Sequence, residues 1–209
     1  MMKRIGVLQG ATLIELLVST AISMLVLTSI GSFYVSLQRN ASEHSQQLIL
    51  NQALSTAVRR IQSDLTRSGF HELKGSALIP SGASATVHVS MGGTVVQYAY
   101  WDSRKPDEAT PVENVVWQFD RDKQKLLVCR TVSSLAQGSK DISYSKTSGC
   151  TSVFEPNLVA VADFRIISNQ VGTASASNQY LQLNIVGELR GNPSVAMSLQ
   201  RDFMVRNGQ

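Results

Sequence analysis

The sequence contains few of the residues from which metal and catalytic sites are built. Only three histidines and two cysteines occur among its 209 residues. The histidines share no metal-ligand spacing, so each is expected to be a surface or packing residue: His44, His71 and His88. The acidic residues near expected turns match no dense oxygen-ligand loop and are expected to be solvated: Asp102, Asp107, Glu108 and Asp120. The sequence therefore predicts a non-enzymatic protein with no metal or other cofactor.

Charge is also sparse and scattered. Charged residues make up 16% of the chain, and the formal net charge is +4. The isoelectric point of about 9.2 would suit a nucleic-acid partner, but the lysines and arginines form no stripe or cluster. Nucleic acid is therefore not expected as a partner.

One stretch, residues 16–38, has no charged residue at all. About 20 apolar residues suffice to cross a bilayer as a helix, so this segment predicts a membrane span. Lys3 and Arg4 precede the segment, which favours a cytoplasmic N-terminus and an exported remainder. Glu15 stands at its start, and a carboxylate at mid-bilayer costs about 2.5 to 3.5 kcal/mol. Glu15 is therefore expected to have a partner and a function.

The residues around this acid, Gly10-Ala11-Thr12-Leu13-Ile14-Glu15, follow a short basic segment. This pattern resembles the class III leader of the type IV pilin-like proteins, which comprise type IV pilins and type II secretion pseudopilins. The resemblance implies that prepilin peptidase cuts between Gly10 and Ala11 and methylates the new amino terminus of Ala11. It also implies that Glu15 acts in subunit assembly. Ala11 departs from the phenylalanine that is usual in the family.

Two other interpretations of this region are weaker. An ordinary secretory signal has an apolar core of about 7 to 15 residues and a cleavage site after it, whereas this apolar segment is longer and the small-residue junction precedes it. A plain signal anchor fits the length of the segment. It leaves Gly10 and Glu15 unexplained.

The helical pattern continues beyond the apolar segment, so one helix is expected over residues 12–68. Its second half has an apolar face of residues three to four apart: Leu37, Ala41, His44, Leu48, Leu54, Val58, Ile61 and Leu65. Gly69 is expected to end the helix in a left-handed cap. The helix-bending proline of the pilin family is missing, and Ser32 stands there beside Gly31.

Alternating β-branched, aromatic and polar residues follow Gly69. Two hairpins are expected, 86–90 with 94–100 and 115–119 with 125–129, followed by strands at 158–167, 180–189 and 195–205 with a small-residue loop at 172–177. The predicted fold class is α+β: a long N-terminal helix on a mainly antiparallel sheet. The expected organisation is a leader at 1–10, a membrane and assembly half-helix at 11–38, an amphipathic half-helix at 39–69 and a periplasmic β-rich head at 70–209.

The two cysteines, Cys129 and Cys150, both follow the span and are therefore expected on the exported side. An even count in an oxidising compartment favours a disulfide, and two buried free thiols remain the alternative. A disulfide here would resemble the bond that bounds a loop near the C-terminus of many pilins.

Short patches at 60–70, 157–165 and 203–207 are similar to PilW-type minor pilins and, more loosely, to J-type minor pseudopilins of type II secretion. The first resemblance implies a structural subunit that helps initiate or cap a type IV pilus. Its partners would be prepilin peptidase, other minor pilins, the major pilin and the inner-membrane assembly platform. It would occupy the bacterial inner membrane and then the fibre, at its tip in the capping role. The alternatives are a type II secretion pseudopilin and a membrane-anchored periplasmic binding module.

Overall fold

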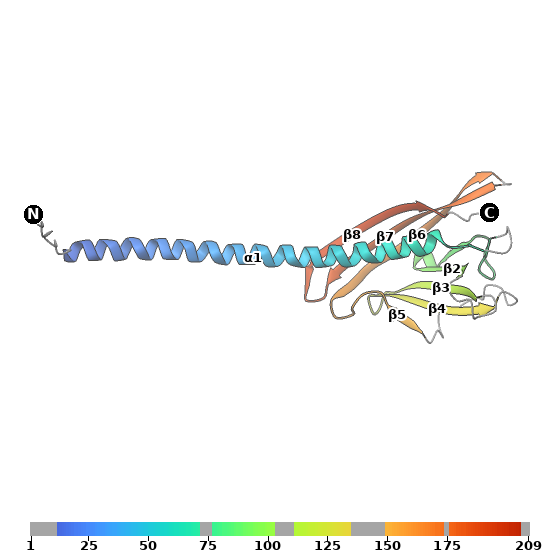
Figure 1. Cartoon of the computed structure of the whole chain (residues 1–209), viewed down its shortest axis with the longest axis horizontal. Coiled ribbons are helices and arrows are strands. Elements are labelled where there is room, and N and C mark those ends of the chain that lie inside the picture. Colours follow the sequence, from blue (N-terminus) through green and yellow to red (C-terminus); the bar gives the residue numbers. More distant parts are fainter. Residues whose placement is uncertain (1–11, 72–76, 103–110, 135–148, 174–175, 206–209) are drawn as a thin grey trace, which may run out of the picture. The chain divides into compact units, whose positions relative to one another are not determined.

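The computed structural model describes residues 12–71, 77–102, 111–134, 149–173 and 176–205 of the chain (Figure 1). Within these residues one long helix, α1, is followed by strands β1 to β8 and a short 3-10 helix, η1. The chain forms two compact units, Met1–Ser45 and Gln46–Gln209. The architecture is α+β with antiparallel strands, as the sequence predicts.

Helix α1 comprises Leu13–Thr66. Its buried residues all lie in the second unit, and they follow the three-to-four spacing of a helix face: Leu50, Leu54, Ala57, Val58, Ile61, Asp64 and Leu65. The prediction placed Leu48 on this face, but its side chain is 68% exposed. The buried stripe is set by Leu50, which is in phase with Leu54, Ala57 and Ile61, whereas Leu48 points away from it.

Gly69 follows the end of α1 and has a φ of 76°, the left-handed conformation expected for it. Its N–H donates a hydrogen bond of 2.8 Å to the carbonyl of Ala99, and the N–H of Trp101 donates one of 2.9 Å to the carbonyl of Phe70. The residues that follow α1 therefore bond directly to the backbone edge of a strand.

The first sheet has five antiparallel strands in the order β1-β2-β3-β4-β5. They are β1 Val87–Ser90, β2 Val95–Trp101, β3 Pro111–Asp120, β4 Lys125–Ser134 and β5 Cys150–Ser152, with η1 at Met91–Gly93 between β1 and β2. Both predicted hairpins are present, with Ser90 opposite Val95 and Asp120 opposite Lys125. Strands β3 and β4 are longer than expected. Strand β5 was not predicted, because three residues give too short a pattern.

The second sheet has three antiparallel strands in the order β6-β7-β8. They are β6 Val159–Thr173, β7 Ala176–Leu189 and β8 Asn192–Met204. The loop expected at 172–177 is wrong in its extent, since Gly172 pairs with Ser177 and Thr173 with Ala176. The described residues thus form two sheets, whereas one was predicted.

The core of the second unit lies where residues 50–65 of α1 meet both sheets. Gly187 on β7 allows close approach of the helix, because a Cβ at this position would lie 2.8 Å from Cδ2 of Leu54. The side-chain amide of Gln179 joins the sheets: it accepts from the N–H of Val87 at 3.1 Å and donates to the carbonyl of Val87 at 2.6 Å. A β7 side chain thereby takes the place of a neighbouring strand beside β1.

Candidate functional site

The start of α1 is a reciprocal capping box formed by Thr12 and Glu15. The Thr12 N–H and hydroxyl donate to Oε2 of Glu15 at 3.0 and 3.1 Å, and the Glu15 N–H donates to Oγ1 of Thr12 at 3.4 Å. These bonds satisfy backbone donors that a helix start leaves without intrahelical partners. The predicted assembly residue Glu15 therefore has a partner within its own chain. Gly10 and Ala11, the predicted cleavage and methylation residues, lie outside the described residues.

The capping box is a feature that the sequence analysis missed. Its signal is present in the sequence, because Thr12 and Glu15 have the Thr-x-x-Glu spacing that precedes an apolar run. Glu15 was expected to have a partner, but the hydroxyl three residues before it was not considered as that partner.

The following helical segment exposes its apolar side chains on every side. Leu13, Leu17, Leu25 and Phe33 are between 58% and 78% exposed, and α1 is long and apolar enough to cross a membrane. The hydroxyls of this segment donate to carbonyls three or four residues earlier: Thr20, Ser23, Thr28, Ser29 and Ser32. These polar groups are therefore compatible with lipid, where an unsatisfied group costs several kcal/mol.

The two cysteines form a disulfide between neighbouring strands. Cys129 on β4 lies directly opposite Cys150 on β5, and their Cα atoms are 4.1 Å apart. The bond attaches β5 to the sheet and closes a segment with a sequence separation of 21 residues. Its role is to hold the edge of the first sheet.

A buried ion pair connects the end of α1 to β4. Asp64, 4% exposed, contacts Nη2 of Arg130 through Oδ2 and Nη2 of Arg67 through Oδ1, the latter at 2.8 Å. Arg130 also donates to the hydroxyl of Tyr100 at 3.0 Å, and Arg67 lies 5.0 Å from the centre of the Tyr100 ring. Burial lowers the pKa of Arg130, but Asp64, Tyr98 and Tyr100 together raise it by more, so the net pKa is raised and the guanidinium stays charged.

A second buried contact lies next to this ion pair. Trp117, fully buried, donates from Nε1 to the hydroxyl of Tyr98 at 2.9 Å. Burial of Tyr98 raises its pKa well above the usual value of 10.0, with the nearby Asp64 adding to the effect. Trp117 is therefore a core residue of the head.

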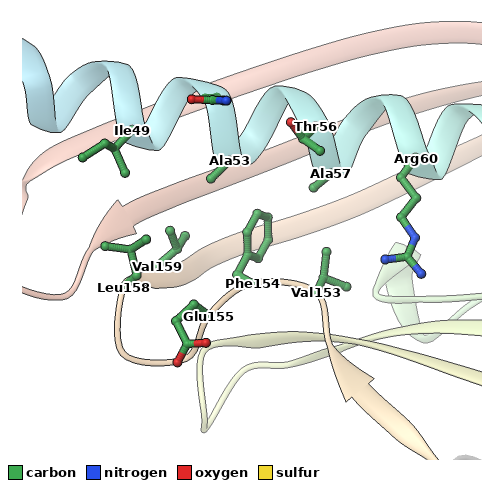
Figure 2. A pocket seen from close by; sticks show the side chains of 11 residues that line it. Ile49, Ala53, Thr56, Ala57, Arg60, Val153, Phe154, Glu155, Leu158 and Val159 are labelled. Atoms are coloured by element: carbon green, nitrogen blue, oxygen red, sulfur yellow. The ribbon is translucent and has the colours of Figure 1, made fainter.

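A groove of about 360 Å³ runs between α1 and the segment that precedes β6 (Figure 2). Its helix side includes Ile49, Ala53 and Arg60, and its other side includes Phe154 and Leu158. Figure 2 shows the Phe154 ring pointing from the strand side towards α1, with the Arg60 guanidinium at one end. The lining is mainly apolar and offers a contact surface.

The other candidate residues are dispersed. His44 lies in α1, His88 in β1, and the ring of His71 lies 5.8 Å from that of Trp101. Across the described parts of the chain, no three histidine, cysteine or acidic residues are grouped in a way that could hold a metal ion.

The expectation for the turn acids is partly wrong. Asp102 is only 8% exposed and is therefore not a solvated turn residue. Asp120 ends β3, and the Lys123 N–H bonds its carboxylate at 3.0 Å and lowers its pKa. Asp107 and Glu108 lie outside the described residues.

The exposed apolar helix, the antiparallel head and the comparison with protein families together define a type IV pilin-like protein. The family model described as prepilin peptidase-dependent protein B matches residues 43–205, and the chain belongs to this family. The name of the family implies processing by prepilin peptidase. Pilin-like proteins are typically structural and not catalytic.

Among solved structures, the chain is similar to a type IV-like pilin from Thermus thermophilus. The identity is 11%, the match covers 75% of this chain and 95% of that one, and the TM-score is 0.44. No curated protein matches the sequence.

Proposed function

We propose that this protein is a minor pilin of PilW type, a structural subunit that helps to initiate or cap a type IV pilus. The observation that carries the proposal is the combination of an apolar helical segment without any buried residue and a head that belongs to the prepilin peptidase-dependent protein B family. Such a segment requires lipid or the helices of other subunits around it. The partners we propose are other minor pilins, the major pilin and the inner-membrane assembly platform.

The proposed organisation follows the expected boundaries. Residues 1–10 are a leader, 11–38 the membrane and assembly half of the helix, 39–69 its amphipathic half, and 70–209 the periplasmic head. Prepilin peptidase cuts between Gly10 and Ala11 and methylates the amine of Ala11. The head then stays periplasmic until the subunit enters the fibre.

Glu15 has a defined task in this scheme. Before cleavage its carboxylate is bonded to Thr12, at 3.0 and 3.1 Å. Cleavage creates an amine one residue before Thr12, close enough along the chain to compete for the same carboxylate. The amine of a neighbouring subunit has the same chemistry, and a charged partner lowers the cost of a carboxylate in lipid. Exchange of the Thr12 bonds for an amine then brings subunits into register.

Two measurements test the proposal. Intact mass and N-terminal mapping of the membrane form should show a mature chain that begins at Ala11, and Gly10 replaced by a bulky residue should leave an uncut precursor. Quantitative mass spectrometry of sheared fibres should find few copies of this chain. A chain cut after residue 38 would contradict the leader assignment, and an abundance equal to that of the main subunit would contradict the minor role.

Deletion separates the proposed function from a minor pseudopilin of type II secretion. Loss of the protein should reduce the number of pili without changing their shafts, and protein secretion should continue. A secretion defect with normal piliation would assign the chain to a secretion system. An unprocessed chain that affects neither would indicate a membrane-anchored binding module.

A further inference from the structure

Strand β8 presents a long backbone edge that is open to another chain. It is the last strand of the sheet β6-β7-β8, and no strand in the described part of the chain pairs with its outer side. Its pairing with β7 continues without interruption from Ala196 to Met204. Such an edge carries a row of N–H and C=O groups that an added strand can bond.

The middle of this edge lacks the features that usually prevent pairing with other chains, and the exposed charged residues Arg201 and Asp202 lie only near its end. Natural edge strands are protected by short length, lysines, prolines, bulges or a covering element. Residues 194–200 contain no charged residue and no proline, and Pro193 stands only at the beginning of β8. The pairing is irregular only at its start, between Glu188 and Leu189 of β7.

The other sheet edges are short or covered. Strand β1 has four residues and β5 has three. The amide of Gln179 bonds the backbone of β1 at Val87, and the disulfide holds β5. The edge of β6 is covered at two points, where its Val161 N–H bonds the Gln124 carbonyl at 2.9 Å and where Gly93 packs against Ile166. Among the described strands, β8 is therefore the exception.

The side chains of β8 define what this edge would accept. Three alternate residues pack against the core but are only partly buried: Val195, Met197 and Leu199. The two residues between them, Ala196 and Ser198, are exposed. An added strand with apolar residues at alternate positions would cover the three partly buried apolar side chains. A strand without charged residues would match the exposed, uncharged side chains between them.

We propose that the outer edge of β8 binds an extended, uncharged segment of a different pilin-like subunit, which adds as a fourth strand to this sheet. Backbone hydrogen bonds supply affinity in this mode, and alternate side chains supply specificity. The inference rests on the proposed function, because that function places other pilin-like subunits beside this one.

A second copy of this chain fits less well, for a geometric reason. Asn192 at the start of β8 donates to Gln46 at 2.9 Å, and Met197 lies opposite Gly187, which packs on Leu54. Strand β8 and the head part of α1 therefore advance in the same direction, as Figure 1 also shows. Antiparallel pairing of two β8 strands would run the head part of α1 in opposite directions in the two copies, whereas the proposed function places all subunits in one fibre with the same orientation.

The test is site-specific photocrosslinking of the full chain in cells that assemble fibres. A photoreactive residue replaces Ser198 on β8, and a second chain carries it at Thr151, an exposed position on β5. Mass spectrometry identifies the linked peptide. We expect the probe at 198 to link to a strand segment of a different pilin-like subunit, and the probe at 151 to give no such product.

Substitutions on the same edge show whether strand pairing is responsible. Gln200→Lys adds a charge to the edge and should lower the crosslink several-fold, whereas Gln200→Thr should retain it. Both chains should reach the membrane with the disulfide formed. If Gln200→Lys does not accumulate, Ala196→Lys provides the same comparison, because residue 196 is exposed as well.

Linkage to a second copy, linkage to a segment that is not a strand, or no linkage in assembling cells would overturn the inference. The same holds if the crosslink is unaffected by Gln200→Lys and Ala196→Lys. The proposed function is tested separately by the pilus count after deletion. A reduced count with linkage to a second copy would leave the minor-pilin role intact and refute only the strand addition.

Discussion

Asp64 on α1 and Arg130 on β4 form an ion pair that fastens the last turn of the helix to the five-stranded sheet. Asp64 is the acidic member of the buried helix stripe and is bonded by two arginines. Removing one member of a buried pair leaves an uncompensated charge in the interior. The contact therefore determines how the helix end is held on the head.

Asp64→Ala should lower the free energy of unfolding by about 1 to 3 kcal/mol. A fully buried pair would lose about 3 to 5 kcal/mol, but the Arg130 side chain is 30% exposed and partly solvated. Arg67→Met is the control and should cost less, since the Arg67 side chain is 45% exposed. Denaturant unfolding compares the two variants with the unmodified chain. A double-mutant cycle of Asp64→Ala with Arg130→Met would measure the coupling between Asp64 and Arg130. A coupling near zero between Asp64 and Arg130 would contradict this prediction.

The buried Tyr98 should make the free energy of unfolding fall at alkaline pH. Its pKa is raised by burial above the usual 10.0, so an unfolded chain releases this proton at a pH where the folded chain retains it. The unfolded state then binds fewer protons, and the free energy of unfolding falls as the pH rises above about 10.

Tyr98→Phe should cost about 1 to 3 kcal/mol at neutral pH, because the buried Trp117 N–H loses its acceptor. The variant should also lose less additional stability between about pH 8 and pH 11 than the unmodified chain. Unfolding midpoints at both pH values provide the measurement. Tyr100, whose pKa is also raised by burial, remains in both chains. Parallel pH curves for the two proteins would show that Tyr98 is not the responsible group.

Much of this fold follows from local patterns in the sequence. The three-to-four spacing predicted α1, Gly69 predicted its end, and the alternation of β-branched and polar residues predicted the first hairpin. The division into two sheets could not be predicted, because it depends on contacts such as that of Gln179 with Val87, 92 residues apart. No local pattern encodes a side chain that substitutes for a strand.

The candidate sites were predicted less completely. The pairing of Cys129 with Cys150 was favoured by an even count on the exported side, with two free thiols as the alternative, and Glu15 was selected for its place beside an apolar run. Asp64 lies on the buried stripe of α1 but was not among the residues predicted for it. Its pairing with Arg130 could not be predicted either, since 66 residues separate the two.

A matched pair of glycines tests the contact between η1 and β6. Gly92 has a φ of 64° and no neighbour within 4 Å of a built Cβ, whereas a Cβ on Gly93 would lie 2.6 Å from the Ile166 carbonyl oxygen, at a φ of 95°. Gly92→Ala should cost about 1 kcal/mol for the left-handed conformation. Gly93→Ala should cost clearly more, because a backbone atom must also move. Equal thermal shifts for the two variants would refute the close contact.

The disulfide should be formed in the native protein and should stabilise the first sheet. Alkylation without reductant should label neither Cys129 nor Cys150. Replacement of both by serine should lower the free energy of unfolding by roughly 3 kcal/mol, the chain-entropy value for a loop of about 20 residues. Denaturant unfolding of the unmodified chain and the double variant provides the comparison. Two thiols labelled in native, unreduced protein would contradict the bond.

The last prediction separates two roles of Glu15, helix capping and pairing with an amine. Thr12→Val removes the hydroxyl that bonds Glu15 at 3.1 Å but keeps the carboxylate, so the chain should still be cut, inserted and assembled. Glu15→Ala should be cut and inserted but enter the fibre poorly. Glu15→Gln is decisive, because its amide oxygen can still accept from Thr12 while it has no charge to attract an amine. If charge pairing drives assembly, Glu15→Gln should resemble Glu15→Ala when sheared fibres are quantified. If Glu15→Gln assembles like the unmodified chain while Thr12→Val fails, the capping box is the assembly determinant and the amine pairing is wrong.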